Sequence, residues 1–280
     1  AAQGDIPLVA RECIGPYLDS VSLLGQRTAE LHIALATVQD NPDFMPEPFS
    51  LEYRRSRYES MGRLVSQTCS LLRSRLNDLP SSMEQEARRV LNNESRMQNR
   101  FRAFSELETC ARRTRCHGDY HLGQVLWTGR DFLISDFEGE PARPLSERRM
   151  KHSPIMDVAG MLRSLYYAPY ATLLRQQPLW HAEGAGASLD SWIRFWCGWV
   201  SVAFLKSYLK IAERASFWPG TQSEFHVLLD AHLLEKAVYE IGYELNNRPH
   251  WVRIPIRGVL DILAMHAGKE IEPHRIKNER

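Results

Sequence analysis

Residues 116 to 141 read CHGDYHLGQVLWTGRDFLISDFEGEP, and this stretch decides the fold. Within it, Val125–Thr128 and Phe132–Ser135 are short apolar runs of β type around a Gly-Arg-Asp turn, which is a hairpin signal. Acidic, amide and imidazole side chains flank this hairpin on both sides. The sequence therefore predicts a β-hairpin that brings polar side chains from its two ends close together.

The flanking side chains match the needs of phosphoryl transfer. This chemistry uses a carboxylate that accepts the proton of the attacking hydroxyl, and oxygen ligands that hold Mg²⁺ against the nucleotide phosphates. Asp119, Gln124 and Asp136 occur in that order, and Mg²⁺ prefers hard oxygen ligands. We predict Asp119 as the base and Gln124 and Asp136 as metal ligands. Glu138 is either a further metal ligand or a solvated charge.

Two other interpretations of the same loop stay open. His117-x-Asp119-x-His121 resembles a nitrogen-ligand metal cluster, although no third histidine or cysteine follows at a matching spacing. In the second interpretation, the loop has only a structural role. We favour the phosphoryl-transfer interpretation, in which His117 supports the loop by hydrogen bonding and Gly118 permits a backbone angle that a side chain would oppose.

The rest of the chain has helical periodicity. Apolar residues recur at three- and four-residue spacings in most other segments, which indicates amphipathic helices. The predicted helices are residues 22–38, 50–76, 83–107, 157–170, 189–215 and 223–248. The fold class is therefore mostly α with one small β-hairpin. We predict a helical part over residues 1–110, the catalytic loop and hairpin over 111–160, and a helical substrate-binding part over 161–280.

The composition is that of an ordinary soluble globular protein. The chain has 280 residues, of which 44% are hydrophobic and 25% charged, with a formal net charge of +1. This balance gives no electrostatic reason to expect a nucleic-acid or membrane partner, and no apolar run reaches the roughly 18 residues that span a bilayer. The five scattered cysteines fit no disulfide framework or zinc knuckle, so we expect a cytoplasmic protein.

The loop and hairpin resemble a known pattern. The order HGDYHLGQ, SDFE, DVAG is similar to the HGDxHxxN…DxE…D pattern of aminoglycoside-phosphotransferase-like kinases, with Gln124 where most members have Asn. GQRTAELHIAL near the start and EKAVYEIGYELNNRPHWVRIPIRG near the end extend the resemblance over nearly the whole chain. Together these segments resemble maltokinases, above all those fused behind trehalose synthase.

This resemblance implies a fold and an activity. The fold would be the helical C-terminal lobe of a protein-kinase-like enzyme. With ATP and Mg²⁺ as cofactors, it would phosphorylate maltose at the anomeric hydroxyl and so supply maltose 1-phosphate for trehalose and glycogen metabolism. Asp157, which also suits a helix N-cap, would brace the catalytic loop. The implied partners are ATP, maltose and a fused or associated trehalose synthase.

The sugar-binding residues are predicted from the later segments. Lys236, Tyr239 and Tyr243 share one helical face and carry polar tips, which suit sugar hydroxyls as well as an ordinary helix surface. The resemblance favours sugar binding, and Arg143 in the charged loop after the hairpin is a further candidate. The tryptophans at positions 192, 196 and 199 also share a face, but we expect them in the core.

A nucleotide-binding lobe is not evident. Residues 1–116 contain four well-separated glycines, no lysine and no series of strands, whereas kinases offer a lysine to the phosphates. We expect the N-terminal lobe to be missing, in agreement with the start at Ala1, and the fragment to be inactive alone. Two alternatives stay open: a related kinase for an amino sugar, choline or an amino acid, and a non-catalytic domain that keeps the fold.

Overall fold

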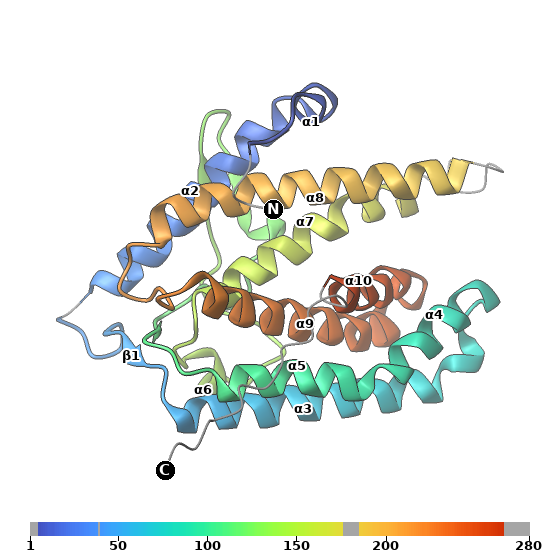
Figure 1. The fold of residues 1–280 in the computed structure, drawn as a ribbon, viewed down its shortest axis with the longest axis horizontal. Coiled ribbons are helices and arrows are strands. Elements are labelled where there is room, and N and C mark those ends of the chain that lie inside the picture. Colours follow the sequence, from blue (N-terminus) through green and yellow to red (C-terminus); the bar gives the residue numbers. More distant parts are fainter. Residues whose placement is uncertain (1–4, 39, 176–184, 266–280) are drawn as a thin grey trace, which may run out of the picture.

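The computed structural model describes residues 5–38, 40–175 and 185–265, and long helices make up most of them (Figure 1). The two ends of the predicted 1–280 domain lie outside the described residues. In chain order the elements are α1 (Leu8–Ile14), α2 (Tyr17–Thr37), β1 (Glu47–Pro48), α3 (Leu51–Ser74), η1 (Leu76–Asp78), α4 (Ser81–Asn92), α5 (Glu94–Glu106), β2 (Arg112–Arg113), η2 (Leu122–Gln124), β3 (Val125–Trp127), β4 (Phe132–Ile134), α6 (Leu145–Arg148), α7 (Ile155–Arg175), α8 (Ala185–Ala212), α9 (Gln222–Asn247), η4 (Pro249–Trp251) and α10 (Arg253–Ala264).

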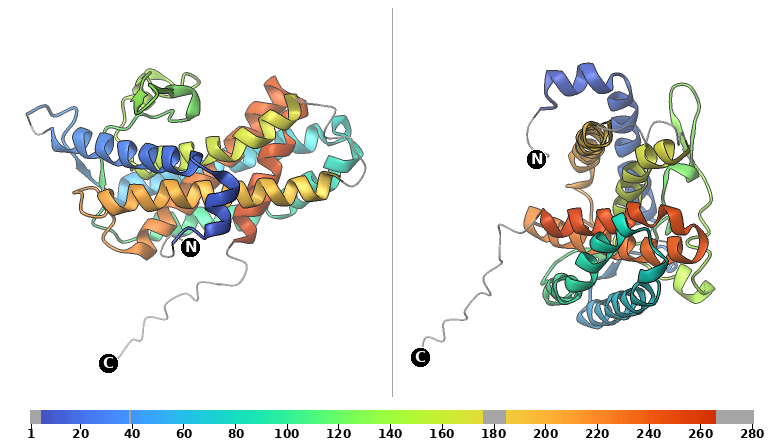
Figure 2. Two further views of the ribbon diagram at one scale, coloured as in Figure 1. Left: turned by 90° about the horizontal axis from the view of Figure 1, so that it is seen from above. Right: turned by 90° about the vertical axis from the view of Figure 1, so that its right-hand side faces the viewer.

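The helices pack in successive pairs. Helix α2 runs along α8, as the views in Figures 1 and 2 agree, and α7 packs against both α8 and α9. Helix α9 also contacts α3, α5 and α10, so it lies at the centre of the molecule. Segments from the start, middle and end of the chain therefore meet around α9.

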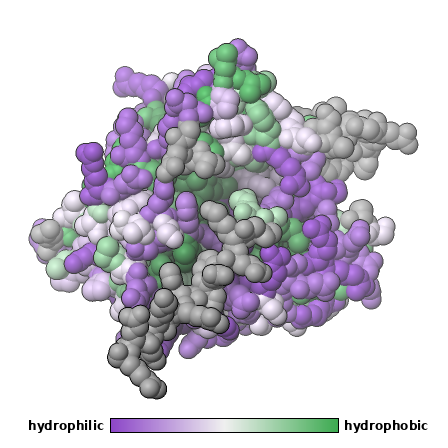
Figure 3. Space-filling view, viewed as in Figure 1, coloured by the Kyte–Doolittle hydropathy of each residue, from purple (hydrophilic) through white to green (hydrophobic). Residues whose placement is uncertain are grey.

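The central position of α9 follows from its sequence. Thr221 caps the helix, because its side chain accepts a hydrogen bond from the Glu224 backbone N–H at 3.2 Å. Apolar side chains then recur on several faces, and they are buried as expected for a helix surrounded by others. Hydrophilic side chains cover most of the face seen in Figure 3, so the apolar ones gather inside.

The predicted hairpin is present. Strands β3 and β4 pair in antiparallel fashion, with Leu126 opposite Leu133, and the hairpin stands out from the helices in Figure 2. The turn is held to α2 by Arg27, whose guanidinium donates to the Asp131 carboxylate at 2.8 and 3.0 Å. This ion pair fixes the hairpin relative to the helices, although the two residues are 104 positions apart.

Several predicted boundaries were wrong. The single helix predicted over residues 83–107 is divided into α4 and α5 at Asn93, whose side-chain amide donates to the Arg89 carbonyl at 2.8 Å. The Pro-rich segment after α2 forms strand β1, which pairs with β2 just ahead of the loop that carries His117 and Asp119. Helix α10 was not predicted; Pro255 lies in its first turn, where a missing N–H is tolerated.

The tryptophan stripe on α8 is core only in part, because Trp196 packs against the core while Trp192 is exposed. Trp192 is 41% exposed and stacks on Phe195, while Trp196 is half-buried against the ring of Tyr17 at 5.3 Å between ring centres. The prediction was wrong for Trp192, because α8 packs against α2 on one side and leaves another side partly exposed to solvent. Within residues 5–38, 40–175 and 185–265, no helix combines the length and the apolarity that crossing a membrane requires.

Candidate active site

The loop that carries Asp119 is held by one buried carboxylate. Asp157, in the first turn of α7, accepts hydrogen bonds from the backbone N–H groups of His117 at 2.7 Å and Gly118 at 3.0 Å. His117 in turn bonds through Nε2 to the Ser135 carbonyl at 2.8 Å, at the end of β4. These bonds tie the loop to both α7 and the hairpin, so its position is set by the fold.

A histidine from α2 completes this support. His32 is fully buried; its Nε2 lies 3.2 Å from Asp157 Oδ2 and its Nδ1 lies 3.0 Å from the Tyr208 hydroxyl. Burial raises the pKa of Asp157, but the hydrogen bonds from His32 and Gly118 outweigh it, and the net pKa is lowered. Sequence reasoning missed His32; a polar residue on the apolar side of a predicted helix was the available signal.

Two glycines allow the loop to take this path. Gly118 has φ +87°, a left-handed conformation that a side chain would strain. Gly160 lies on α7 one turn after Asp157, where a Cβ would approach the Tyr120 carbonyl oxygen to 2.7 Å. The loop therefore lies directly against the backbone of α7.

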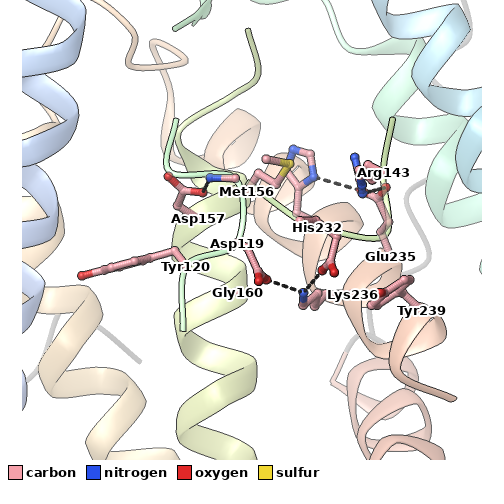
Figure 4. Close-up of a pocket in the computed structure, with 12 residues that line it drawn as sticks. Asp119, Tyr120, Arg143, Met156, Asp157, Gly160, His232, Glu235, Lys236 and Tyr239 are labelled. Carbon is pink, nitrogen blue, oxygen red and sulfur yellow. Dashed lines mark hydrogen bonds and ion pairs between the residues drawn. The ribbon is translucent and has the colours of Figure 1, made fainter. Parts of the chain in front are cut away.

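Asp119 lies at the mouth of a pocket and shares a lysine with a second carboxylate (Figure 4). Lys236 Nζ lies 3.4 Å from Asp119 Oδ1 and 3.3 Å from Glu140 Oε2, and the His121 imidazole lies 3.6 Å from Asp119. Burial raises the pKa of Asp119, but His121 and the Lys236 charge lower it to about 2. Asp119 is therefore ionised at neutral pH.

The far wall of the pocket is a buried ion pair. Arg57 from α3 donates to both oxygens of Glu235 at 2.6 and 2.7 Å, and His232 Nδ1 lies 3.3 Å from the same carboxylate. Arg143, predicted as a sugar ligand, lies 3.8 Å from Glu235 and lines the pocket. Arg57 and Glu235 were not predicted, because the two residues are 178 positions apart and each alone looks like an ordinary helix charge.

The predicted sugar residues on α9 are placed differently from one another. Lys236 and Tyr239 line the pocket, and the Lys236 ammonium lies 5.1 Å from the Tyr239 ring centre. Tyr243, one turn further, is 45% exposed and lies beside Arg248, outside the pocket lining. The free cavity is only about 40 Å³, because Lys236 and its partners fill the middle.

The predicted metal ligands meet at the base of the hairpin. Gln124 Nε2 donates to Asp136 Oδ2 at 2.8 Å, so the amide and the carboxylate are in direct contact. Asp136 has φ +65°, a left-handed conformation that is uncommon for residues with a side chain, although aspartate adopts it more readily than most. Glu138 is exposed, and its carbonyl, not its carboxylate, bonds to Arg148 at 3.4 Å.

The donor set fits a hard cation and not a nitrogen-rich cluster. Among the described residues, no group of three or more histidine, cysteine, aspartate or glutamate side chains could hold a metal ion. The His117-x-Asp119-x-His121 interpretation therefore has no support, since His117 faces Ser135 instead. The Gln124–Asp136 pair offers one amide oxygen and one carboxylate at the surface, which is the kind of partial set that Mg²⁺ uses.

Comparison with known sequences identifies sugar-kinase relatives. No family model matches the chain. It is 27% identical over 152 residues to a glucosamine kinase of Streptacidiphilus jiangxiensis, covering 52% of this chain and 31% of that protein. It is 30% identical over 140 residues to a glucosamine kinase of Mycolicibacterium smegmatis, covering 50% and 32% respectively. Each alignment spans about a third of the relative's length.

Solved structures share the fold. A glucosamine kinase in complex with glucosamine, ADP and inorganic phosphate superposes with a TM-score of 0.73 at 21% identity, covering 92% of this chain and 58% of that one. A second crystal form of a glucosamine kinase gives a TM-score of 0.71, also at 21% identity, covering 92% of this chain and 55% of that one. The predicted mostly helical architecture is confirmed, and this chain has the fold of the matched part of these kinases. The maltokinase resemblance is not confirmed, since the relatives named here are glucosamine kinases.

Proposed function

We propose that this chain carries the catalytic base, the metal ligands and the sugar pocket of an ATP-dependent sugar kinase. One observation carries the proposal: a loop braced by Asp157 presents an ionised Asp119 to a pocket, while the hairpin that follows holds Gln124 against Asp136. The proposed base and one metal ligand thus precede the hairpin, and the second metal ligand follows it. The glucosamine kinase relatives support the same class of reaction.

Asp119 would accept the proton of the attacking sugar hydroxyl. Its carboxylate is ionised at neutral pH and lines the pocket, so a hydroxyl entering there meets a proton acceptor. The Lys236 ammonium lies 3.4 Å from Asp119 Oδ1, one of the two oxygens that a hydroxyl could approach. A bound sugar would replace or shift this ion pair, which explains how a pocket with little free volume admits a substrate.

Gln124 and Asp136 would hold Mg²⁺, with Glu138 near enough in sequence to contribute through a bound water. The ion would neutralise charge on the transferred phosphate when bound. The left-handed conformation of Asp136 directs its side chain at Gln124, so the two ligands are already paired by the fold.

ATP is the proposed phosphate donor, and ADP in the solved glucosamine kinase supports it. A lysine for the phosphates is not available in residues 1–116, because the first lysine of the chain is Lys151. Lys151 is occupied by Glu47 at 2.8 Å and the Pro42 carbonyl at 2.7 Å. We therefore propose that binding of the ATP phosphates requires a lysine from a nucleotide-binding lobe outside these 280 residues.

A neutral sugar fits the pocket charges. Four carboxylates line it, but Asp119 and Glu140 share Lys236, Glu235 is paired with Arg57, and Asp157 accepts backbone N–H groups. A substrate cation would compete with Lys236 and Arg143. Maltose, phosphorylated at its anomeric hydroxyl, is the specific proposal; it rests on the sequence resemblance, as does the link to trehalose synthase.

An amino sugar is the second candidate. Asp119 and Glu140 carry two negative charges and share the single ammonium of Lys236. A substrate ammonium placed between them would complete the neutralisation, and the curated relatives are named glucosamine kinases.

Calorimetric titration of the chain with maltose, glucosamine and glucose tests these proposals. A neutral-sugar site binds maltose more tightly than glucosamine, and the variant Glu140→Gln changes the two affinities alike. Selective loss of glucosamine binding in Glu140→Gln would favour the second candidate. Failure of all three sugars to bind at millimolar concentrations would contradict the sugar pocket itself.

A further inference from the structure

A second and larger cavity lies away from the catalytic pocket. It has a volume of about 570 Å³, is lined by residues before and in β1, in and after β2 and just after α6, and shares no lining residue with the catalytic pocket. Three separate segments form its walls. The lining residues are Pro42, Asp43, Glu47, Arg113, Arg115, Arg149, Met150 and Lys151.

Positive charge exceeds negative charge in this cavity. Its lining carries three arginines and a lysine against Asp43 and Glu47. Glu47 is already neutralised twice over, by Arg113 at 2.6 Å on one oxygen and by Lys151 at 2.8 Å on the other. The remaining cations, Arg115 and Arg149, share the cavity lining with one further carboxylate, that of Asp43.

The two remaining arginines keep most of their hydrogen-bond donors for a ligand. Arg115 uses one terminal nitrogen to bond the Arg149 carbonyl at 2.6 Å, and its guanidinium lies 5.8 Å from the Phe44 ring centre. The Arg149 side chain is exposed and makes no hydrogen bond or ion pair with the described part of the chain. Arginine presents five donors in a fork that matches phosphate oxygens.

We propose that this cavity is a binding site for the phosphate group of a small phosphate ester, held by Arg115 and Arg149. Lys151 adds positive charge from a fixed position, because its side chain is 8% exposed and tied to the Pro42 carbonyl. The cavity is much larger than one phosphate group, which leaves space for the organic part of an ester. The proposal does not rest on the sugar-kinase function.

The site has a direct connection to the catalytic loop. Arg115 is two residues before His117, and the backbone of Thr114 pairs with that of His152 at 2.8 and 2.9 Å, directly after the Arg149–Lys151 segment. A ligand that bridges Arg115 and Arg149 would therefore hold the two chain segments that lead into and out of the active site.

Titration with inorganic phosphate, glucose 1-phosphate and glucose tests the proposal. The titrations are done in EDTA at constant ionic strength with chloride, so that metal-assisted binding at Gln124 and Asp136 does not contribute. Both phosphate compounds should bind at this cavity, whereas any binding of glucose at the catalytic pocket should be the same in the wild type and in the arginine variants. Tighter binding of the ester than of inorganic phosphate would identify an ester site. Arg149→Gln and Arg115→Gln should each weaken binding roughly tenfold or more, as expected for a charge-assisted bond.

Arg89→Gln is the matched control. Arg89 is exposed on α4, far from β1 in Figure 1, and its replacement lowers the net charge by the same amount. It should leave phosphate binding unchanged. Phosphate binding no stronger than that of chloride would overturn the proposal, as would equal affinities in Arg149→Gln and Arg89→Gln. Because Arg149 is exposed, its variant should unfold at the wild-type temperature without ligand, which keeps the result interpretable if Arg115→Gln folds poorly.

Discussion

The two sides of Asp119 are built in different ways. On the α7 side, the loop is fixed by short hydrogen bonds from backbone N–H groups to the buried Asp157 carboxylate, with fully buried His32 behind it. On the α9 side, Asp119 meets only the long and flexible Lys236 side chain at 3.4 Å. The difference indicates that the α7 side is preorganised, while the α9 side, where we propose that the sugar binds, consists of ion pairs that a ligand can replace.

The largest effect should come from the residue that both sides share. Asp119→Asn keeps the shape but removes the proton acceptor, so phosphoryl transfer should fall about 10²–10⁴-fold. Steady-state kinetics on a form of the protein that transfers phosphate measures this, with the free energy of unfolding as the control for folding. Near-normal turnover would remove Asp119 from the role of base.

Removing the hydrogen bonds on the α7 side of Asp119 should lower the free energy of unfolding. Asp157→Ala leaves the N–H groups of His117 and Gly118 and the His32 ring without their acceptor in a buried site. We expect a loss of about 3 kcal/mol in the free energy of unfolding, measured by urea denaturation. Lys236→Met, on the exchangeable side, should change stability much less. Equal losses in the two variants would contradict the comparison.

Acid should lower the stability of the protein through His152, whose backbone pairs with that of Thr114 just ahead of the loop. Burial, followed by the nearby positive charge of Arg57, lowers the pKa of His152 to about 3. Below about pH 6.5 the unfolded chain binds a proton that the folded chain excludes, so stability falls as pH drops towards 3, by up to about 1.4 kcal/mol per unit. Unfolding of His152→Gln should have a shallower dependence between pH 6.5 and 4.5. An unchanged slope in the variant would show that other groups dominate.

The smallest expected effects separate two tyrosines on α9. Tyr239 lines the pocket and Tyr243 does not. Tyr239→Ala should weaken sugar binding roughly tenfold, since a stacking ring is lost, while Tyr243→Ala should have little effect. Calorimetry with maltose, beside thermal unfolding of both variants, decides this. A larger loss of affinity in Tyr243→Ala would mean that the sugar lies further along the helix.

Local patterns predicted the parts of the site that are continuous in sequence. The hairpin boundaries agree within one residue, because β-type runs around a turn specify it locally. The contacts of Asp157 with the loop followed from a recognisable order of residues. Periodicity could not separate α4 from α5, since the break at Asn93 depends on one side-chain bond to the backbone.

Long-range partners were beyond the reach of the sequence. His32 and Asp157 are 125 positions apart, and Arg57 and Glu235 are 178 apart, so neither pair leaves a local signal. The β1–β2 pairing and the cavity beside it were missed for the same reason. Tyr243 was grouped with Tyr239 by helical spacing, but spacing does not show where the neighbouring elements end.

The long separations also bear on how the site comes into being during synthesis. A ribosome that has released the chain only as far as residue 150 has delivered the entire loop and hairpin, yet Asp157 is not present to receive the N–H groups of His117 and Gly118. Arg57 lacks its ion-pair partner for longer still, because Glu235 is synthesised 178 residues after it. The motif read most easily in the sequence therefore depends on residues that are synthesised after it, and it lacks these hydrogen-bond and ion-pair partners until α7 and α9 have emerged.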